Sequence, residues 1–185
     1  MSTLATQIRN AAFDRLKIFR EFKSLRKSPV ETLQPTDLPA LGVFLLRETM
    51  NADGDYNVGE PRFIVDAVIS ISVVDLATSG NVLDGRIDEW VDRIEDTLLC
   101  DPTFVRLNDD KGDPLIEGFS QIARSYSFPK NGDSYLMEVR LQLTIRFRCY
   151  FAPQTQNTLQ IVAVTAQPFG AAGTTFENEF LTNGS

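Results

Sequence analysis

The acidic spacing closest to that of a metal site lies in the polar stretch at residues 51–61, NADGDYNVGEP. Asp53 and Asp55 alternate with other residues, as the ligands of a calcium-binding loop do. Such a loop also needs a glycine at its tight turn and a bidentate glutamate at its end, and Tyr56 and Arg62 occupy those two positions here. We therefore expect no bound metal, since turn-forming residues explain the composition.

A second group of acids lies at residues 81–99, where apolar residues recur at the 3.6-residue spacing of a helix. The apolar stripe is Leu83, Ile87, Trp90, Val91, Ile94 and Leu98, and the acids are Asp84, Asp88, Glu89, Asp92, Glu95 and Asp96. Carboxylates on one face can perform acid–base catalysis. Nothing nearby raises a pKa, however, so the pattern favours a solvated acidic face. Asp101 and Pro102 end the predicted helix.

Other catalytic signals are missing from the sequence. The chain has no histidine, which removes the commonest general base and metal ligand. Cys100 and Cys149 stand far apart in no paired motif, and we expect two small, buried apolar side chains. There is no phosphate-binding glycine loop and no nucleophile motif. We therefore expect a protein that is not an enzyme and has no cofactor, with carboxylate chemistry on sugars or nucleotides as the alternative.

Length and charge limit the remaining classes. At 185 residues, the chain has room for one real core. It has no apolar run long enough for a membrane span and no signal-peptide core at its start, so we expect a protein made in the cytosol. The net charge of −7 argues against a general nucleic-acid binder. Residues 1–27 are nevertheless basic, which keeps a nucleic-acid-binding first helix as another alternative.

The first half of the chain predicts a helix followed by two strands. Residues 3–27 place apolar residues on one face at helical spacing, with Phe13 and Leu16 off this stripe. A proline-containing linker at 27–37 leads to an apolar strand at 38–47. Residues 62–75 alternate in the manner of a strand, and its second face is half apolar. That face needs a cover from this chain or from a neighbour.

The second half predicts a short apolar segment at 104–107 and then a long hairpin. Its strands are residues 115–128 and 134–151, joined by 129–133, which contains the Asn-Gly pair typical of hairpin turns. Eighteen residues would extend for nearly 60 Å at about 3.3 Å each, so the hairpin must bend, bulge or project. We predict an α+β fold: a mixed, mainly antiparallel sheet with two helices packed on one face and a long C-terminal β-hairpin.

Residues 152–185 differ from the 1–151 domain, because their only charges are Glu177 and Glu179. We interpret them as a C-terminal extension in which 159–164 is a candidate added strand. The rest is either a disordered tail or an arm that orders on a partner. The anchors of such a partner-binding arm would be Phe169, Phe176, Phe180 and Leu181.

The order of these elements, together with several local stretches, resembles the bacteriophage tail terminator proteins related to lambda gpU. Four stretches carry the resemblance: IRNAAFDRL at 8–16, DLPALGVFL at 37–45, IDEWVDRIED at 87–96 running into Asp101-Pro102, and LQLTIRF at 141–147. They span residues 3–151. The extension after Phe151 departs from the shorter family members.

The resemblance implies a structural virion protein of the tail or neck, assembled in the host cytoplasm. It implies a hexameric ring that caps the tail tube, stops tail polymerisation and presents a surface to the head-completion or connector protein. DNA would pass through the lumen without sequence-specific binding. Another neck, head–tail connector or baseplate component of the same fold is the alternative.

A ring requires subunit contacts, and the last long strand offers candidates. Arg140, Arg146 and Arg148 share one face of residues 134–151, opposite the face that the helices would cover. Their candidate partners on a neighbour are Asp53, Asp55, Glu60 and the acids of 81–99. Alternatively, the arginines face water or line the lumen.

Overall fold

A single twisted sheet is the centre of the fold. The computed structural model describes residues 3–29, 32–54, 60–77, 80–109, 112–128, 130–131 and 134–151. The strand order is β1-β2-β3-β6-β4, and short β5 also pairs with β6. The strands are β1 (Ser24–Arg26), β2 (Ala40–Ala52), β3 (Arg62–Ala77), β4 (Gly118–Ser127), β5 (Lys130–Asn131) and β6 (Ser134–Tyr150). Only the β1–β2 pair is parallel, so the predicted mixed, mainly antiparallel sheet is confirmed.

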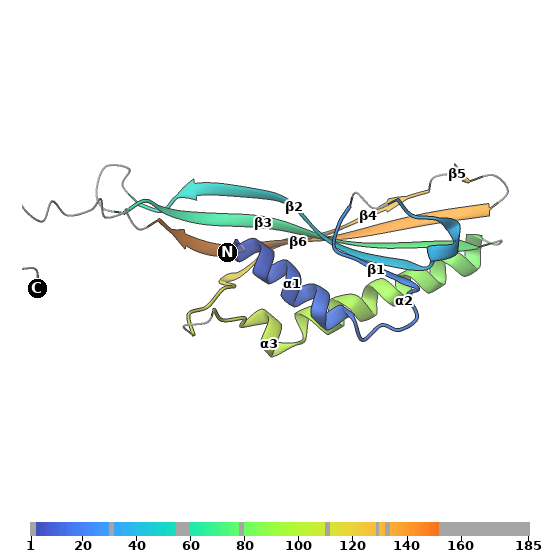
Figure 1. The fold of residues 1–185 in the computed structure, drawn as a ribbon, viewed down its shortest axis with the longest axis horizontal. Helices are drawn as coiled ribbons and strands as arrows, with labels where there is room; N and C mark the ends of the chain where they lie inside the picture. Colours follow the sequence, from blue (N-terminus) through green and yellow to red (C-terminus); the bar gives the residue numbers. More distant parts are fainter. Residues whose placement is uncertain are drawn as a thin grey trace, which may run out of the picture. The chain divides into compact units, whose positions relative to one another are not determined.

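Two helices cover one face of this sheet, which we call the helix face (Figure 1). They are α1 (Leu4–Leu16), which begins at the N-cap Thr3, and α2 (Gly80–Leu99). A four-residue helix, α3 (Pro102–Val105), follows α2 and was not predicted. The α+β class, with helices on one face and a long hairpin formed by β4 and β6, is confirmed.

The core lies between the helices and the helix face. Alternation along β3 and β6 turns one set of side chains inward, as strand geometry requires. The largest fully buried side chains of the core are Phe104, Ile8, Leu16, Leu41, Ile69, Ile71, Leu83, Ile87, Ile94, Leu98, Leu141 and Leu143. Every residue of the predicted α2 stripe is buried.

The prediction of one helix over 3–27 is wrong beyond Leu16. The chain turns there, and the predicted outliers Phe13 and Leu16 are buried, whereas Ile18 is 65% exposed. After the turn, the Phe22 ring packs 4.9 Å from Trp90, centroid to centroid, and β1 pairs with β2. A continued helix would lose both contacts, and such tertiary packing outweighs local helix preference.

The strand boundaries differ from the expected ones in two places. β2 continues to Ala52 because it pairs with β3 along its whole length, past a register shift between Leu45 and Arg47. β4 begins at Gly118 rather than at 115, and its own shift lies between Phe119 and Gln121. These β-bulges supply the irregularity that the length of the strands requires.

The chain itself covers part of the opposite face of the sheet, which we call the far face. Leu38, Ala40 and Val74 form a second small buried cluster there, joined by Leu33 and Leu76 among others. The half-apolar face predicted for β3 is thus covered at this point without a neighbour.

On the same face, the ring of Phe44 lies against the backbone at Gly42, which only a glycine allows. A Cβ atom added at Gly42 would overlap the ring of Phe44. Gly42 therefore gives the ring room to lie back along its own strand, and Phe44 is buried in this position.

Candidate assembly surfaces

The far face of β6 carries the arginines that the sequence singled out. Arg146 lies opposite Asp66 of β3, and its Nε and Nη2 atoms donate to the two carboxylate oxygens at 2.9 and 3.0 Å. These bonds lower the pKa of Asp66. The pair is bidentate, a geometry that adds orientation to the charge attraction.

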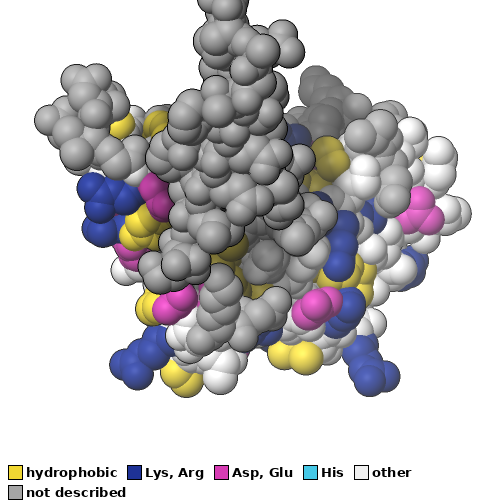
Figure 2. Space-filling view, turned by 60° about the vertical axis from the view of Figure 1, so that its left-hand side comes forward, with side chains coloured by type: hydrophobic (Ala, Val, Ile, Leu, Met, Phe, Trp, Pro, Cys, Tyr) yellow, Lys and Arg dark blue, Asp and Glu magenta, His cyan; other side chains and the backbone are white. Residues whose placement is uncertain are grey.

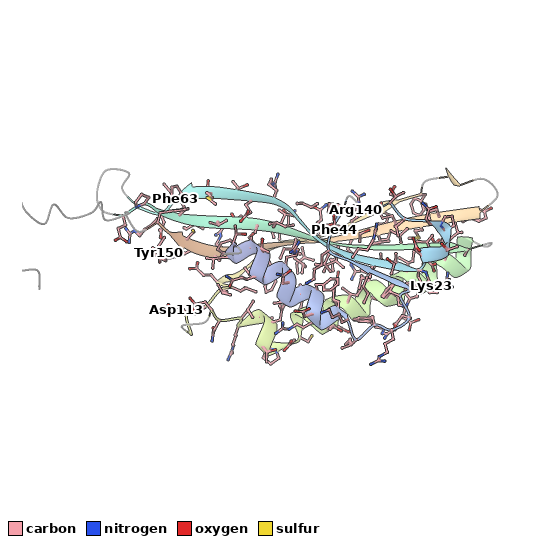
Figure 3. The ribbon with its side chains drawn as sticks, in the orientation of Figure 1. Lys23, Phe44, Phe63, Asp113, Arg140 and Tyr150 are labelled. Carbon is pink, nitrogen blue, oxygen red and sulfur yellow. The ribbon has the colours of Figure 1, made fainter. Side chains whose placement is uncertain are left out.

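Arg140 is paired along its own strand. It projects from the sheet on the side away from the helices (Figure 3) and donates to Glu138 at 2.7 and 3.0 Å. The hydroxyl of Ser72 donates to the same carboxylate at 2.8 Å. Burial alone would raise the pKa of Glu138, but these bonds outweigh it and the pKa lies below its usual range.

Arg148 meets two acids from other parts of the fold. Its Nε atom lies 2.9 Å from Glu117 Oε1, and its Nη1 atom lies 3.6 Å from Asp53 Oδ2. Two predicted site residues, Arg148 and Asp53, are therefore brought together within one chain. Glu60 is exposed and has no ion pair among the described residues, and Asp55 lies outside them.

All three arginines thus have carboxylate partners in their own chain. Three of these partners, Asp66, Glu117 and Glu138, were not among the predicted site residues. Alternation places Asp66 and Glu138 on the far face, but only the strand register shows which charges meet. On the coloured part of the one face that Figure 2 shows, basic and acidic side chains are interspersed rather than gathered in fields of one sign.

The sheet has two open edges within the described residues. β1 pairs with only Ala40–Gly42, so the outer edge of β2 from Val43 onward has no strand partner. β4 is the last strand on the other side. Large apolar side chains are exposed at both edges, Leu46 and Met50 on β2 and Ile122 and Tyr126 on β4, each between 45% and 49%.

The acidic face of α2 is solvated, as predicted, except where it meets β4. Arg124 of that strand donates to Glu95 at 2.6 Å and to Asp92 at 2.8 Å. The bonds to Glu95, opposed by partial burial and reinforced by Asp92, raise the pKa of Arg124. Asp84, Asp88, Glu89 and Asp96 are exposed.

The candidate ligands of other chemistries are dispersed. Among the described residues, no three cysteine or acidic side chains are grouped as a metal site. Cys149 is half-buried, and burial followed by the charge of Glu48 raises the pKa of its thiol. Cys100 is exposed, so the prediction that both cysteines are buried is wrong for it, because it follows the last turn of α2. No described helix is long and apolar enough to cross a membrane.

Comparison with known proteins finds similarity among solved structures only. No protein-family model and no curated protein matches the chain. Among solved structures, it is similar to a chain described as "Virion of native gene transfer agent (GTA) particle", with 13% sequence identity and a TM-score of 0.41. The match covers 75% of this chain and 94% of that chain. A likeness of this degree carries no argument about function, which rests on the sequence resemblance and on the surfaces described above.

Proposed function

We propose that this chain is a structural protein of a tailed virion, a tail terminator that forms a hexameric ring on the tail tube. The ring stops tail polymerisation and offers the surface to which the head-completion or connector protein binds. The observation that carries this proposal is the sequence resemblance to tail terminators, whose four stretches fall in α1, at the start of β2, in α2 and in β6. Within the described residues the sheet has an open edge on each side. This supports the proposal, because a ring needs two different contact surfaces on each subunit.

The far face of the sheet suits the lining of a DNA channel. A surface that binds DNA offers unpaired basic groups to the phosphates. Here Arg140, Arg146 and Arg148 already have carboxylate partners, so the face has little net positive field. Such a lining lets DNA pass without sequence-specific binding.

The extension serves as the arm that binds the tube or the head-completion protein. Its anchors are Phe169, Phe176, Phe180 and Leu181, which lie outside the described residues. The assignment rests on composition, since apolar anchors in a nearly uncharged segment can order on a partner.

The test is deletion of the gene in the virus or particle that encodes the chain. We expect overlong or headless tails by electron microscopy, because nothing ends tube growth or joins the head. The full chain should restore normal tails, whereas residues 1–151 alone should cap the tube but join heads poorly. Tails of normal length that join heads without the protein would contradict the proposal. Tails of normal length without heads would indicate a neck connector instead.

A subunit contact through the far-face arginines, the alternative to their place in the channel lining, is tested by substitution. If they bind a neighbour's acids, the double variant Arg146→Glu and Arg148→Glu repels those acids, and ring yield at low salt falls while the variant stays folded. The three ion pairs lost within the chain are partly exposed to water, so folding should lose little stability. The matched control is Arg106→Glu, an exposed arginine on neither strand. Unchanged ring yield in a folded double variant would exclude the contact and leave the arginines to the lumen.

A further inference from the structure

The two open edges of the sheet have complementary directions. Each of the pairs β2–β3, β3–β6 and β6–β4 is antiparallel, so β4 runs opposite to β2. If a second copy of the chain stands beside the first in the same orientation, β4 of one meets β2 of the next as an antiparallel pair. The contact is head-to-tail and repeats until the ring closes.

The edges also lie at the same height along the strands. Following the register across the sheet, Thr49 of β2 is level with Asp66, Arg146 and finally Gly118 of β4. In the same way, Val43 is level with Arg124. Residues Val43–Thr49 of the unpaired part of β2 are therefore level with Gly118–Arg124, the first seven residues of β4.

The bulges preserve this match. The β2 shift lies between Leu45 and Arg47, and the β4 shift lies between Phe119 and Gln121, at neighbouring levels of the sheet. A bulge increases the local twist of its strand. Because both edges change course at nearly the same height, they can stay side by side along their length.

Beside the exposed charges Arg47 and Glu48 of β2 and Arg124 of β4, both edges expose apolar side chains, and two of these turn to the same side. Met50 pairs with Val65, and Ile122 pairs with Leu143, so both lie on the helix face. β4 contains neither lysine nor proline, two common means of protecting an open edge. A strand from a neighbour would bury these side chains and bond the unpaired backbone groups.

The helix layer has matching charges. The segment after α1 continues into β1 at the β2 edge and exposes Arg20 and Lys23, and the amide of Lys23 donates to Pro39 O. At the other side of the sheet, α2 exposes Asp92, which pairs with Arg124 of β4. Joining the sheets edge to edge therefore brings basic groups of one copy towards an acid of the next.

We infer that the occupant of both edges is a second copy of this chain, with β4 of one subunit paired to Val43–Ala52 of the next in one continuous sheet. This inference rests on the proposed ring and identifies the interface between its subunits. It replaces the far-face arginines as the principal subunit contact, since they are already paired within the chain.

Disulfide trapping in the full chain tests this interface between subunits. In a background with Cys100→Ser and Cys149→Ser, the far-face positions Thr49 and one of Gly118, Gln121 or Ala123 are changed to cysteine. The set of pairs allows for a shift in the register of β4 against β2 of the next subunit. Within one chain, three strand spacings, or roughly 14 Å, separate the edges, beyond the reach of about 7 Å between Cα atoms that a disulfide allows. We expect a ladder of covalent multimers up to the closed ring from at least one double variant, and none from the single variants.

Three controls show which segment pairs with each open edge of the sheet. Thr49→Cys with Asp113→Cys, an exposed pair off the β4 edge, should give no ladder. Dimers from a single β4 cysteine would mean that two β4 edges pair with each other, which overturns the inference. A disulfide within the monomer in Thr49→Cys with Gln160→Cys would mean that the chain's own extension occupies the β2 edge, which also overturns it.

The outcome is distinguishable from failure of the proposed function. Rings seen by electron microscopy without any ladder of disulfide-linked multimers would overturn the inferred interface, and so would a chain that stays monomeric. A ladder from rings that do not cap tail tubes would support the interface and reject the terminator function.

Discussion

Replacing Phe104 by alanine is expected to lower the free energy of unfolding by about 3–5 kcal/mol. The side chain is completely buried, lies 6.3 Å from Phe119 between ring centroids and carries the Arg15 guanidinium over its ring at 5.2 Å. The substitution leaves a cavity where α1, α3 and β4 meet. Urea denaturation measures the loss.

The control for this variant is Phe128→Ala. Phe128 is 65% exposed, so its loss should change stability by no more than about 0.5 kcal/mol. Equal effects of the two substitutions would show that α3 is not part of the cooperative core.

Replacing Arg86 by methionine is expected to have the second largest effect, about 2–3 kcal/mol, because it leaves the Asp75 carboxylate buried without its counterion. Asp75 is 3% exposed, pairs with Arg86 through Oδ2 and accepts the Leu76 amide at Oδ1. The value lies below that of a fully buried pair because the Arg86 side chain is 40% exposed. Adding Asp75→Asn should recover most of the loss, which a double-mutant cycle measures.

Arg93→Met provides a matched control. Arg93 also stacks on an aromatic ring, at 4.9 Å from Phe19 against 5.5 Å between Arg86 and Trp90, but its partner Glu21 is partly exposed. We expect a cost of about 0–1 kcal/mol there. If Arg86→Met costs no more than Arg93→Met, the buried pair contributes nothing beyond a surface contact.

The periodic elements were predictable because their burial follows one rule. β6 alternates along its length, and α2 keeps a single apolar stripe between acids, so each pattern allows one structure. β3 also alternates at its start, but from Ala67 to Asp75 it is buried on both faces. Residues 17–27 carry helical periodicity too, but Phe22 finds Trp90 and Ser24–Arg26 find β2 only if the helix ends. Those contacts join residues far apart in sequence, which local periodicity does not report.

The candidate assembly surfaces were likewise predictable only in part. Alternation identifies Arg140, Arg146 and Arg148 as one face, but not that Asp66 lies opposite Arg146 or that Glu117 reaches Arg148. These pairings depend on the register between strands and on the path of the chain before β4. The open edges were equally hidden, because the sequence does not state which strands end the sheet.

The position of β3 beside β6 has a consequence for synthesis of the protein. β3 ends at Ala77, and its partner β6 begins at Ser134, so roughly 60 residues separate them. At the usual 5–20 residues per second, the ribosome takes about 3–12 s to make that interval. Throughout it, one edge of the most apolar strand of the nascent chain has no partner. The chain is therefore most prone to aggregate while it is still being made, and chaperone demand should peak before β6 emerges.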